Sequence, residues 1–337
     1  MVGRRVAALR RRLRAGEARL IVGASDLRAL TGAPIEGCWL LVRRDETVVL
    51  ASRMTASAVR AALPGVQVCD GERILPLLLE HRGSVRTLRV DDGIPWSLYR
   101  ALRRHFSVIP DGETGRLRMV KTPAEISSLR EACRVCTRVV RRAARMLRPG
   151  ITERAVAFDI AAAYFRYGAV ESFPTIVAFD ANTAFPHHIP GETRYRPGSI
   201  AMIDTGCRID GMCSDITRMY GTREHAEIHR VERVIRDLQR ELVSLCRPGV
   251  AVAAIDRRAR KVCRDRGMLH RYLHTTGHGI GLEIHEAPRV SVADRTVLEP
   301  GMTITVEPGV YFDGAFGIRI EDTVLVTHGR PEVLTAG

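Results

Sequence analysis

Apolar residues recur along the first third of the chain in short runs that alternate between helical and strand spacing. Val6, Leu9 and Leu13 share one helical face and predict a helix over residues 4–15. Runs rich in Val and Leu predict short strands, and amphipathic runs predict further helices. The predicted strands are 20–22, 39–42, 47–50 and 87–90, and the predicted helices are 54–63, 74–80 and 96–105. This alternation predicts an α/β domain over residues 1–115.

A turn-rich segment at 110–115 predicts a linker to a second domain, 116–337. Thr122, Pro123 and Glu125 then predict a helix start, with a threonine cap, a proline in the first turn and a glutamate that completes a capping box. Further predicted elements are helices from there to about 147 and at 152–167, 223–246 and 251–267, and β-hairpins at 199–220 and 302–326.

The first predicted hairpin carries two acids in apolar surroundings. Asp210-Gly211 is a strong two-residue hairpin turn. With that turn, Gly206 lies opposite Asp215, and Asp204 shares the face of Gly206 because it is two residues away. Asp204 and Asp215 are therefore diagonal neighbours, within reach of a shared cation. Two solvent-facing acids on an edge hairpin are the alternative, which the apolar neighbours disfavour.

The second predicted hairpin repeats this feature. Glu307 and Glu321 each lie in an apolar run, and Arg319 and Asp322 lie close enough in sequence to pair with site charges. One acid in a strand is usually solvated, whereas four in two matching hairpins indicate a common site. The matching pair of hairpins also predicts a duplicated half-domain.

A glycine-rich segment with three histidines, residues 274–286, lies between the hairpins. Its glycines allow close backbone approach, and its histidines, with four nearby carboxylates, predict a site rather than isolated core residues. Four carboxylates and an imidazole suit Mn²⁺, Co²⁺, Fe²⁺ or Zn²⁺. Such a set can hold two cations about 3.5 Å apart. The loop Pro186-His187-His188 precedes the first hairpin, and either histidine could face the site.

The chain carries a formal net charge of +14. Binding to nucleic acid or to an acidic surface is one interpretation, and compositional bias is the other. Only Lys121 and Lys261 are lysines, and the arginines are mostly scattered. This scatter favours bias, so nucleic acid is not expected as the main partner.

Other compositional features narrow the setting. The sequence has no run of about 18 apolar residues, so no membrane-spanning helix is expected. The basic N-terminus lacks the apolar stretch of a secretory signal. We therefore expect a cytoplasmic protein. The eight cysteines include Cys133-x-x-Cys136, but no second pair stands at zinc-site spacing. All eight are predicted to be reduced.

With these motifs the chain resembles the pita-bread metallopeptidases, a family that includes prolidase, aminopeptidase P and methionine aminopeptidase. The resemblance covers about 121–326. The sequences HTTGHGIGLEIHE and FPHHIP are similar to signatures of the prolidase and aminopeptidase P branch. Residues 1–115 resemble the N-terminal domain of creatinase and prolidase. The resemblance implies an α+β fold, with a pita-bread catalytic domain of two pseudo-symmetric halves behind an N-terminal creatinase-like α/β domain.

Metal ligands follow from the resemblance residue by residue. Asp204 would chelate one ion, Asp215 and Glu321 would bridge two, and His278 and Glu307 would hold the other. The implied cofactors are two divalent ions, Mn²⁺ or Co²⁺ before Zn²⁺ or Fe²⁺.

Catalytic roles are implied in the same way. His187 and His285 would contact the substrate and the tetrahedral intermediate. Glu307 would also carry a proton, and Arg319 matches the family arginine near the bridging glutamate.

The implied activity is cleavage of the bond before proline in Xaa-Pro dipeptides or N-terminal Xaa-Pro peptides, by a homodimer acting on short proline-containing peptides without membrane attachment. The alternative is a pita-bread protein with little catalysis that acts as a basic nucleic-acid or protein-binding module.

Overall fold

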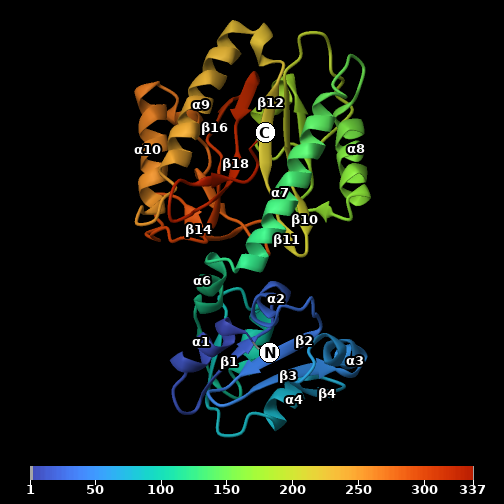
Figure 1. Cartoon of the computed structure of the whole chain (residues 1–337), viewed down its shortest axis with the longest axis vertical. Coiled ribbons are helices and arrows are strands. Elements are labelled where there is room, and N and C mark those ends of the chain that lie inside the picture. Colours follow the sequence, from blue (N-terminus) through green and yellow to red (C-terminus); the bar gives the residue numbers. More distant parts are fainter. Residues whose placement is uncertain (1–2, 337) are drawn as a thin grey trace. The chain divides into compact units, whose positions relative to one another are not determined.

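The computed structural model describes residues 3–336 and divides between Arg118 and Met119 into two compact units (Figure 1). The segment predicted as a linker, 110–115, instead completes strand β6 (Ser107–Pro110) and begins helix α6 (Glu113–Met119). Asp111 favours this helix start because its Oδ1 accepts a hydrogen bond from the Glu113 amide at 3.2 Å. The expected boundary at residue 115 therefore falls inside a helix.

The first unit is a six-stranded mixed sheet with helices on both faces. The strand order is β4-β3-β2-β1-β5-β6. Adjacent residues of one strand, Leu40 and Leu41, belong to different hydrophobic clusters, so both faces of the sheet are buried. The strands other than β6 are β1 (Glu17–Ile21), β2 (Cys38–Val42), β3 (Thr47–Ser52), β4 (Gln67–Gly71) and β5 (Thr87–Val90). The helices are α1 (Arg4–Arg12), α2 (Ala24–Thr31), α3 (Arg53–Ala62), α4 (Ile74–Glu80) and α5 (Trp96–Leu102).

The predicted elements of this unit are confirmed, with ends shifted by up to about three residues. Helix α2 and strands β4 and β6 were not predicted. Strand β4 has no buried residue, so it lacks the apolar alternation that marks a strand.

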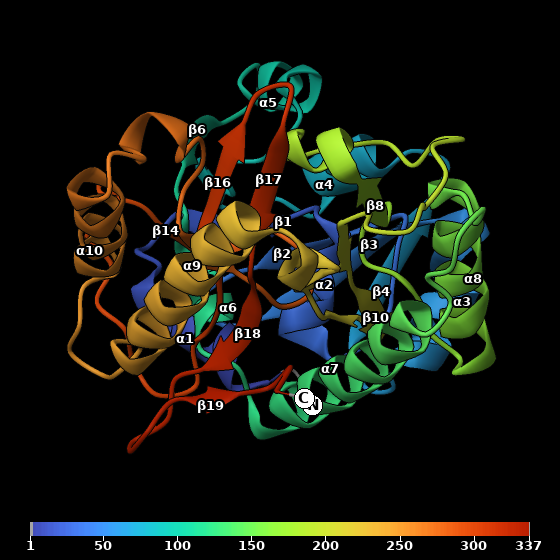
Figure 2. The same cartoon turned by 90° about the horizontal axis from the view of Figure 1, so that it is seen from above.

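The second unit places strands between two pairs of long helices. Figures 1 and 2 show α7 (Pro123–Ala144) and α8 (Glu153–Arg166) on one side, and α9 (Ala226–Ser244) and α10 (Val252–Asp265) on the other. The capping box at Thr122 and Glu125 is present at the start of α7. No helix within residues 3–336 has the length and apolar character needed to cross a bilayer. All eight cysteines are free, as predicted.

The strands of this unit form two principal sheets. One has the order β12-β9-β8 and the other β14-β13-β15-β18-β19. An isolated bridge between Thr217 and Glu321 joins them. The strands of the first sheet and its extension are β7 (Val170–Glu171), β8 (Ile176–Phe179), β9 (Ala201–Thr205), β10 (Cys207–Ile209), β11 (Met212–Cys213) and β12 (Ile216–Tyr220). The remaining strands are β13 (Gly277–Gly279), β14 (Glu286–Val290), β15 (Thr303–Val306), β16 (Gly309–Phe312), β17 (Phe316–Arg319), β18 (Asp322–Leu325) and β19 (Glu332–Val333).

The first hairpin has the predicted turn and register. Asp210 and Gly211 have φ angles of 48° and 82°, the left-handed pair that a tight hairpin turn requires. Asp204 pairs with Thr217, as the turn position predicts. The hairpin bends between β9 and β10, where a Cβ on Gly206 would lie 1.9 Å from the Ser214 carbonyl oxygen. This bend ends the regular pairing beside Asp215.

The second hairpin is confirmed, but its ladder is interrupted in the middle. Strand β15 pairs with β18, and β16 pairs separately with β17. Pro308 interrupts one arm because it has no amide hydrogen to donate. Glu307 and Glu321 occupy the two interruptions, outside the regular strands. The two acids therefore lie where the backbone changes direction.

The bend at Gly206 predicts a cost for any side chain there. Gly206→Ala should lower the free energy of unfolding by on the order of 1–3 kcal/mol, because the added methyl group meets backbone rather than a movable side chain. Gly115→Ala is the matched control, since nothing lies within 4 Å of its Cβ position. Urea denaturation measures both. Equal stability of Gly206→Ala and wild type would contradict the close approach.

Candidate metal centre

A cavity of about 730 Å³ opens in the second unit and is bordered by its two principal sheets. It is lined by all the residues predicted for the site: His187, Asp204, Asp215, His278, His285, Glu307, Arg319 and Glu321. This one cavity is thus lined by residues of both hairpins, the glycine-rich segment and the Pro186-His187 loop. The sequence separates these residues by more than 130 positions, and the fold brings them together.

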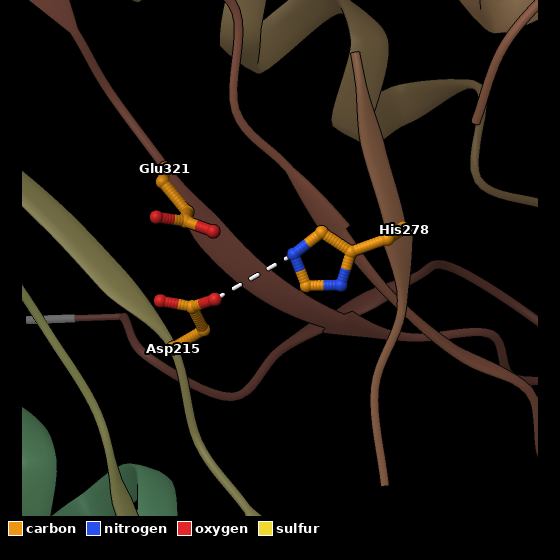
Figure 3. A group of neighbouring side chains, drawn as sticks. All are labelled: Asp215, His278 and Glu321. Carbon is orange, nitrogen blue, oxygen red and sulfur yellow. Dashed lines mark ion pairs between the residues drawn. The ribbon is translucent and has the colours of Figure 1, made fainter. Parts of the chain in front are cut away.

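Three of the five predicted ligands form the centre of this group. Single ligand atoms of Asp215, His278 and Glu321 lie within 4.8 Å of one another, and the three side chains point toward a common centre (Figure 3). His278 Nε2 is 3.6 Å from Asp215 Oδ2. Thr217 Oγ1 donates to Glu321 Oε2 at 2.6 Å and fixes that carboxylate.

The other two predicted ligands flank the centre. Glu307 Oε1 is 3.5 Å from His278 Nε2 and accepts from Thr305 Oγ1 at 3.3 Å. Asp204 Oδ2 accepts a hydrogen bond from Arg319 Nη2. The arginine predicted beside the bridging glutamate thus contacts Asp204 directly, and it shares the Thr217 hydroxyl with Glu321.

The donor set fits divalent cations. Asp204 Oδ1, Asp215 Oδ1 and Glu321 Oε1 are buried and have no hydrogen-bond partner within the described residues. Burial of an unpaired carboxylate oxygen is costly. Bound divalent cations would give these oxygens partners and would offset the charge of the carboxylates.

The pKa values of the carboxyl groups reflect their burial close to one another. Burial raises the pKa of Asp215 well above its ordinary range, and the charges of Glu321, Asp204 and Glu307 add to that effect. Burial likewise raises the pKa of Glu321, with the same sign from Glu307 and Asp204. Burial raises the pKa of Glu307 to about 7, against the opposing effect of Arg319.

The imidazole of His278 is held in the form that binds metals. Burial lowers the pKa of His278 to about 4, so the ring is neutral at pH 7. Nδ1 lies 3.0 Å from the Gly279 carbonyl oxygen, which assigns the ring proton to Nδ1. Nε2 then presents a lone pair to the carboxylates.

The remaining histidines lie around this centre. The His285 ring stands edge-on to His278 at a centroid distance of 4.4 Å. Burial lowers the pKa of His274 to about 4 and also lowers that of His285, and the nearby His187 acts in the same direction on both. His188 Nε2 donates to the buried Glu153 carboxylate at 2.8 Å, whereas His187 does not take part in this hydrogen bond.

Two residues at the centre had no predicted role. His274 Nδ1 is 3.9 Å from Glu307 Oε2, and His274 Nε2 is 2.9 Å from the Tyr311 hydroxyl. Arg319 Nη1 donates to that hydroxyl at 2.6 Å. The position of His274, four residues before His278 in the glycine-rich segment, was a usable signal. Tyr311 gave none, because only the pairing of β16 with β17 brings it beside Arg319.

Fold and site together define a metal-dependent hydrolase with a pita-bread catalytic unit. The chain belongs to metallopeptidase family M24, whose family model matches residues 127–328, and within it to the prolidase branch. It is therefore a metallopeptidase.

Several relatives span nearly the whole chain. The Xaa-Pro dipeptidase of Pyrococcus furiosus is 30% identical over 311 residues, which cover 90% of this chain and 88% of the relative. The structure of the dipeptidase PepE from Mycobacterium ulcerans matches with a TM-score of 0.91 at 30% identity, covering 99% and 94% of the two chains. The X-Pro aminopeptidase of Thermotoga maritima matches with a TM-score of 0.87 at 26% identity, covering 98% of each chain. These names give no support to the alternative of a basic binding module.

The unpaired buried carboxylates predict that replacing Asp215 raises stability without metal and reduces the stabilisation by metal. In metal-free protein, Asp215→Asn should raise the melting temperature, because it removes one charge from the cluster. The gain should be larger at pH 7 than at pH 5: the pKa of Asp215 is raised in the folded state, so its ionisation opposes folding as pH rises. Mn²⁺ should stabilise wild type, by about 2.7 kcal/mol at 100 times its Kd, and the variant much less.

Thermal unfolding with EDTA and with added Mn²⁺ measures both effects. Asp210→Asn is the matched control, since Asp210 is a turn residue of the same hairpin and lies outside the cavity lining. It should respond to Mn²⁺ as wild type does. An equal Mn²⁺ shift in wild type and Asp215→Asn would remove Asp215 from the ligand set.

Proposed function

We propose that the chain is a dinuclear metallopeptidase that cleaves the bond before proline in Xaa-Pro dipeptides or N-terminal Xaa-Pro peptides. The observation that carries the proposal is the cluster of three buried, unpartnered carboxylate oxygens around a neutral imidazole in the cavity. The Xaa-Pro preference is supported by the names of the relatives and by the similarity of two loops to the prolidase and aminopeptidase P signatures.

The proposed ligands are those implied by the resemblance. Asp204, Asp215, His278, Glu307 and Glu321 would together hold two divalent ions. Bound cations would polarise the scissile carbonyl and lower the pKa of a water molecule. Mn²⁺ or Co²⁺ is proposed first, and Zn²⁺ or Fe²⁺ suits the same mixed oxygen and nitrogen donors.

Glu307 is the proposed proton carrier. Its carboxylate lies at the cavity edge of the cluster, hydrogen-bonded by Thr305 and near two histidines. The charge of Arg319 favours the ionised form of Glu307 against the effect of burial. In that form Glu307 can accept a proton from the attacking water and return it to the leaving amine.

The residues on the open side of the cavity would contact the peptide. His187 and His285 are exposed there and have no place in the proposed ligand set. Arg319 would orient Asp204 and the Tyr311 hydroxyl. Part of the wall is apolar, formed by Phe173, Pro174, Ile176, Ile189 and Pro190. Such a surface suits the pyrrolidine ring of a proline residue.

Three further features are proposed on the same footing: a homodimer, a cytoplasmic location, and short proline-containing peptides rather than nucleic acid as partners. A length series, Ala-Pro against Ala-Pro-Ala, separates a dipeptidase from an aminopeptidase. Activity on Ala-Pro alone indicates a dipeptidase.

The division between ligands and substrate contacts predicts different outcomes for two neighbouring histidines. His278→Ala should lose metal and activity together. His285→Ala should keep both ions but lose much of kcat, because it is assigned to the substrate side. Metal content by elemental analysis and kcat on Met-Pro give the test. Loss of metal in His285→Ala would reverse the assignment.

The substrate proposal predicts a preference at the second peptide position. A peptide bond before proline lacks an N–H, and the ring fixes the chain direction. A site shaped to that ring should favour proline by about 10- to 200-fold over alanine. The measurement is kcat/KM for Met-Pro and Met-Ala substrates of equal length, with one metal and at one pH.

Chelation is the control for this comparison. EDTA should abolish cleavage of both substrates, and added Mn²⁺ or Co²⁺ should restore it. Equal kcat/KM values for the two substrates would contradict the preference for Xaa-Pro bonds. The assignment as a metallopeptidase would still stand. Full activity in protein shown to be metal-free would contradict the proposal that hydrolysis depends on a metal.

A further inference from the structure

A buried carboxylate outside the proposed metal site holds the loop that carries His187. Glu153 is the first residue of α8, and its side chain has no exposed surface. A buried carboxylate is tolerated only when its oxygens are well bonded. Glu153 Oε1 accepts from the Phe179 amide at 2.7 Å and from Asn182 Nδ2 at 2.9 Å. Its Oε2 lies 2.8 Å from His188 Nε2 and accepts from the Gly191 amide at 3.0 Å.

All four partners belong to one segment, residues 179–191. This segment leaves β8, passes through a short 3-10 helix at Asp180–Ala184 and then forms one wall of the cavity with residues 186–190. Glu153 contacts it at its start, its middle and its end. A single side chain on α8 therefore bonds to this segment at four points.

His187 is fixed on both sides by these contacts. The residue after it, His188, is bound to Glu153. The carbonyl of the residue before it, Pro186, accepts a hydrogen bond from Arg319 Nη1 at 3.3 Å. The backbone of His187 is thus held between the α8 carboxylate and the arginine of the proposed metal site. His187 lines the same cavity as His274 and His285.

We propose that Glu153 is a positioning residue for the peptidase reaction, which acts by holding the 179–191 segment so that His187 faces the substrate. This inference rests on the proposed function for its kinetic part. Glu153 itself does not line the cavity, so its effect passes through the segment. The competing view is that Glu153 only stabilises the fold.

A glutamine at position 153 is the appropriate change because it preserves the shape. Each carboxylate oxygen receives one backbone amide, Phe179 N–H or Gly191 N–H. Whichever way the glutamine amide is turned, its own N–H₂ group faces one of these two donors. At least one backbone donor is left unsatisfied in the interior, which loosens that end of the segment.

The test is a double-mutant cycle with His187. Glu153→Gln should lower kcat/KM for Met-Pro by about 10- to 100-fold in the presence of Mn²⁺, since a displacement on the order of 1 Å at a positioned group can cost about 100-fold. In the His187→Ala background the same change should cost less than about twofold further. Such non-additivity shows that Glu153 acts through His187. Full additivity would overturn the proposal.

Glu232→Gln is the matched control for stability alone. Glu232 is also a buried glutamate, 5% exposed, and it accepts hydrogen bonds from Thr222 and Arg236. It lies on α9 and does not line the cavity. Its replacement should lower the melting temperature without changing kcat/KM. A loss of kcat/KM in Glu232→Gln equal to that in Glu153→Gln would assign both losses to stability.

Hydrogen exchange provides a measurement that does not need activity. Glu153→Gln should speed amide exchange across 179–191 and leave β9 unchanged. If wild type fails to cleave Met-Pro, the proposed function fails, and the exchange result still decides whether Glu153 holds the segment. Unchanged exchange in 179–191 would overturn the proposal whatever the kinetics.

Discussion

The structure of the second unit depends on placing several carboxylates together at a mostly buried site. Asp204, Asp215 and Glu321 are each at most 7% exposed, and each has a buried oxygen without a hydrogen-bond partner. Such an arrangement opposes folding unless a multivalent cation joins the charges. The cluster therefore destabilises the folded unit. Burial of apolar side chains in the two hydrophobic cores under the long helices must offset this effect.

The strands meet this constraint by interrupting their own ladders. A regular strand sends alternate side chains to opposite faces, which cannot converge carboxylates from several strands on a point. The bend at Gly206 lies beside Asp215, and the break at Pro308 lies beside Glu307. The bridge between Thr217 and Glu321 then joins the sheets at the cluster itself. The irregular positions in the sheets are thus the positions that carry the site.

The sequence predicted those parts of this arrangement that depend on local rules. The Asp210-Gly211 turn and the two-residue period were enough to place Asp204 opposite Thr217 and on the same side as Asp215. The second hairpin was also predicted, but the interruption of its ladder and the path of the chain around Pro308 do not follow from alternation. Strand β4 was missed because its side chains are not buried.

Contacts between distant segments had no local signal. Thr217 reaches Glu321 across 104 residues, and Arg319 reaches Asp204 across 115. Glu153 reads in the sequence as an ordinary acid in the first turn of a helix, a position that favours acids in any protein. Only the fold shows that its carboxylate turns inward to Phe179 and Gly191.

These contacts divide the site into two mechanical parts. The carboxylates and His278 lie in or directly beside sheet strands, where backbone pairing limits their movement. His187 lies on a segment with little regular structure. Its position depends on hydrogen bonds that this segment donates to the Glu153 carboxylate and accepts from the Arg319 side chain. Arg319 belongs to both parts, since it binds Asp204 with one nitrogen and the Pro186 carbonyl with another. A change in the charge of the carboxylate cluster can therefore reach the substrate side of the cavity through this single guanidinium group, without movement of the strands.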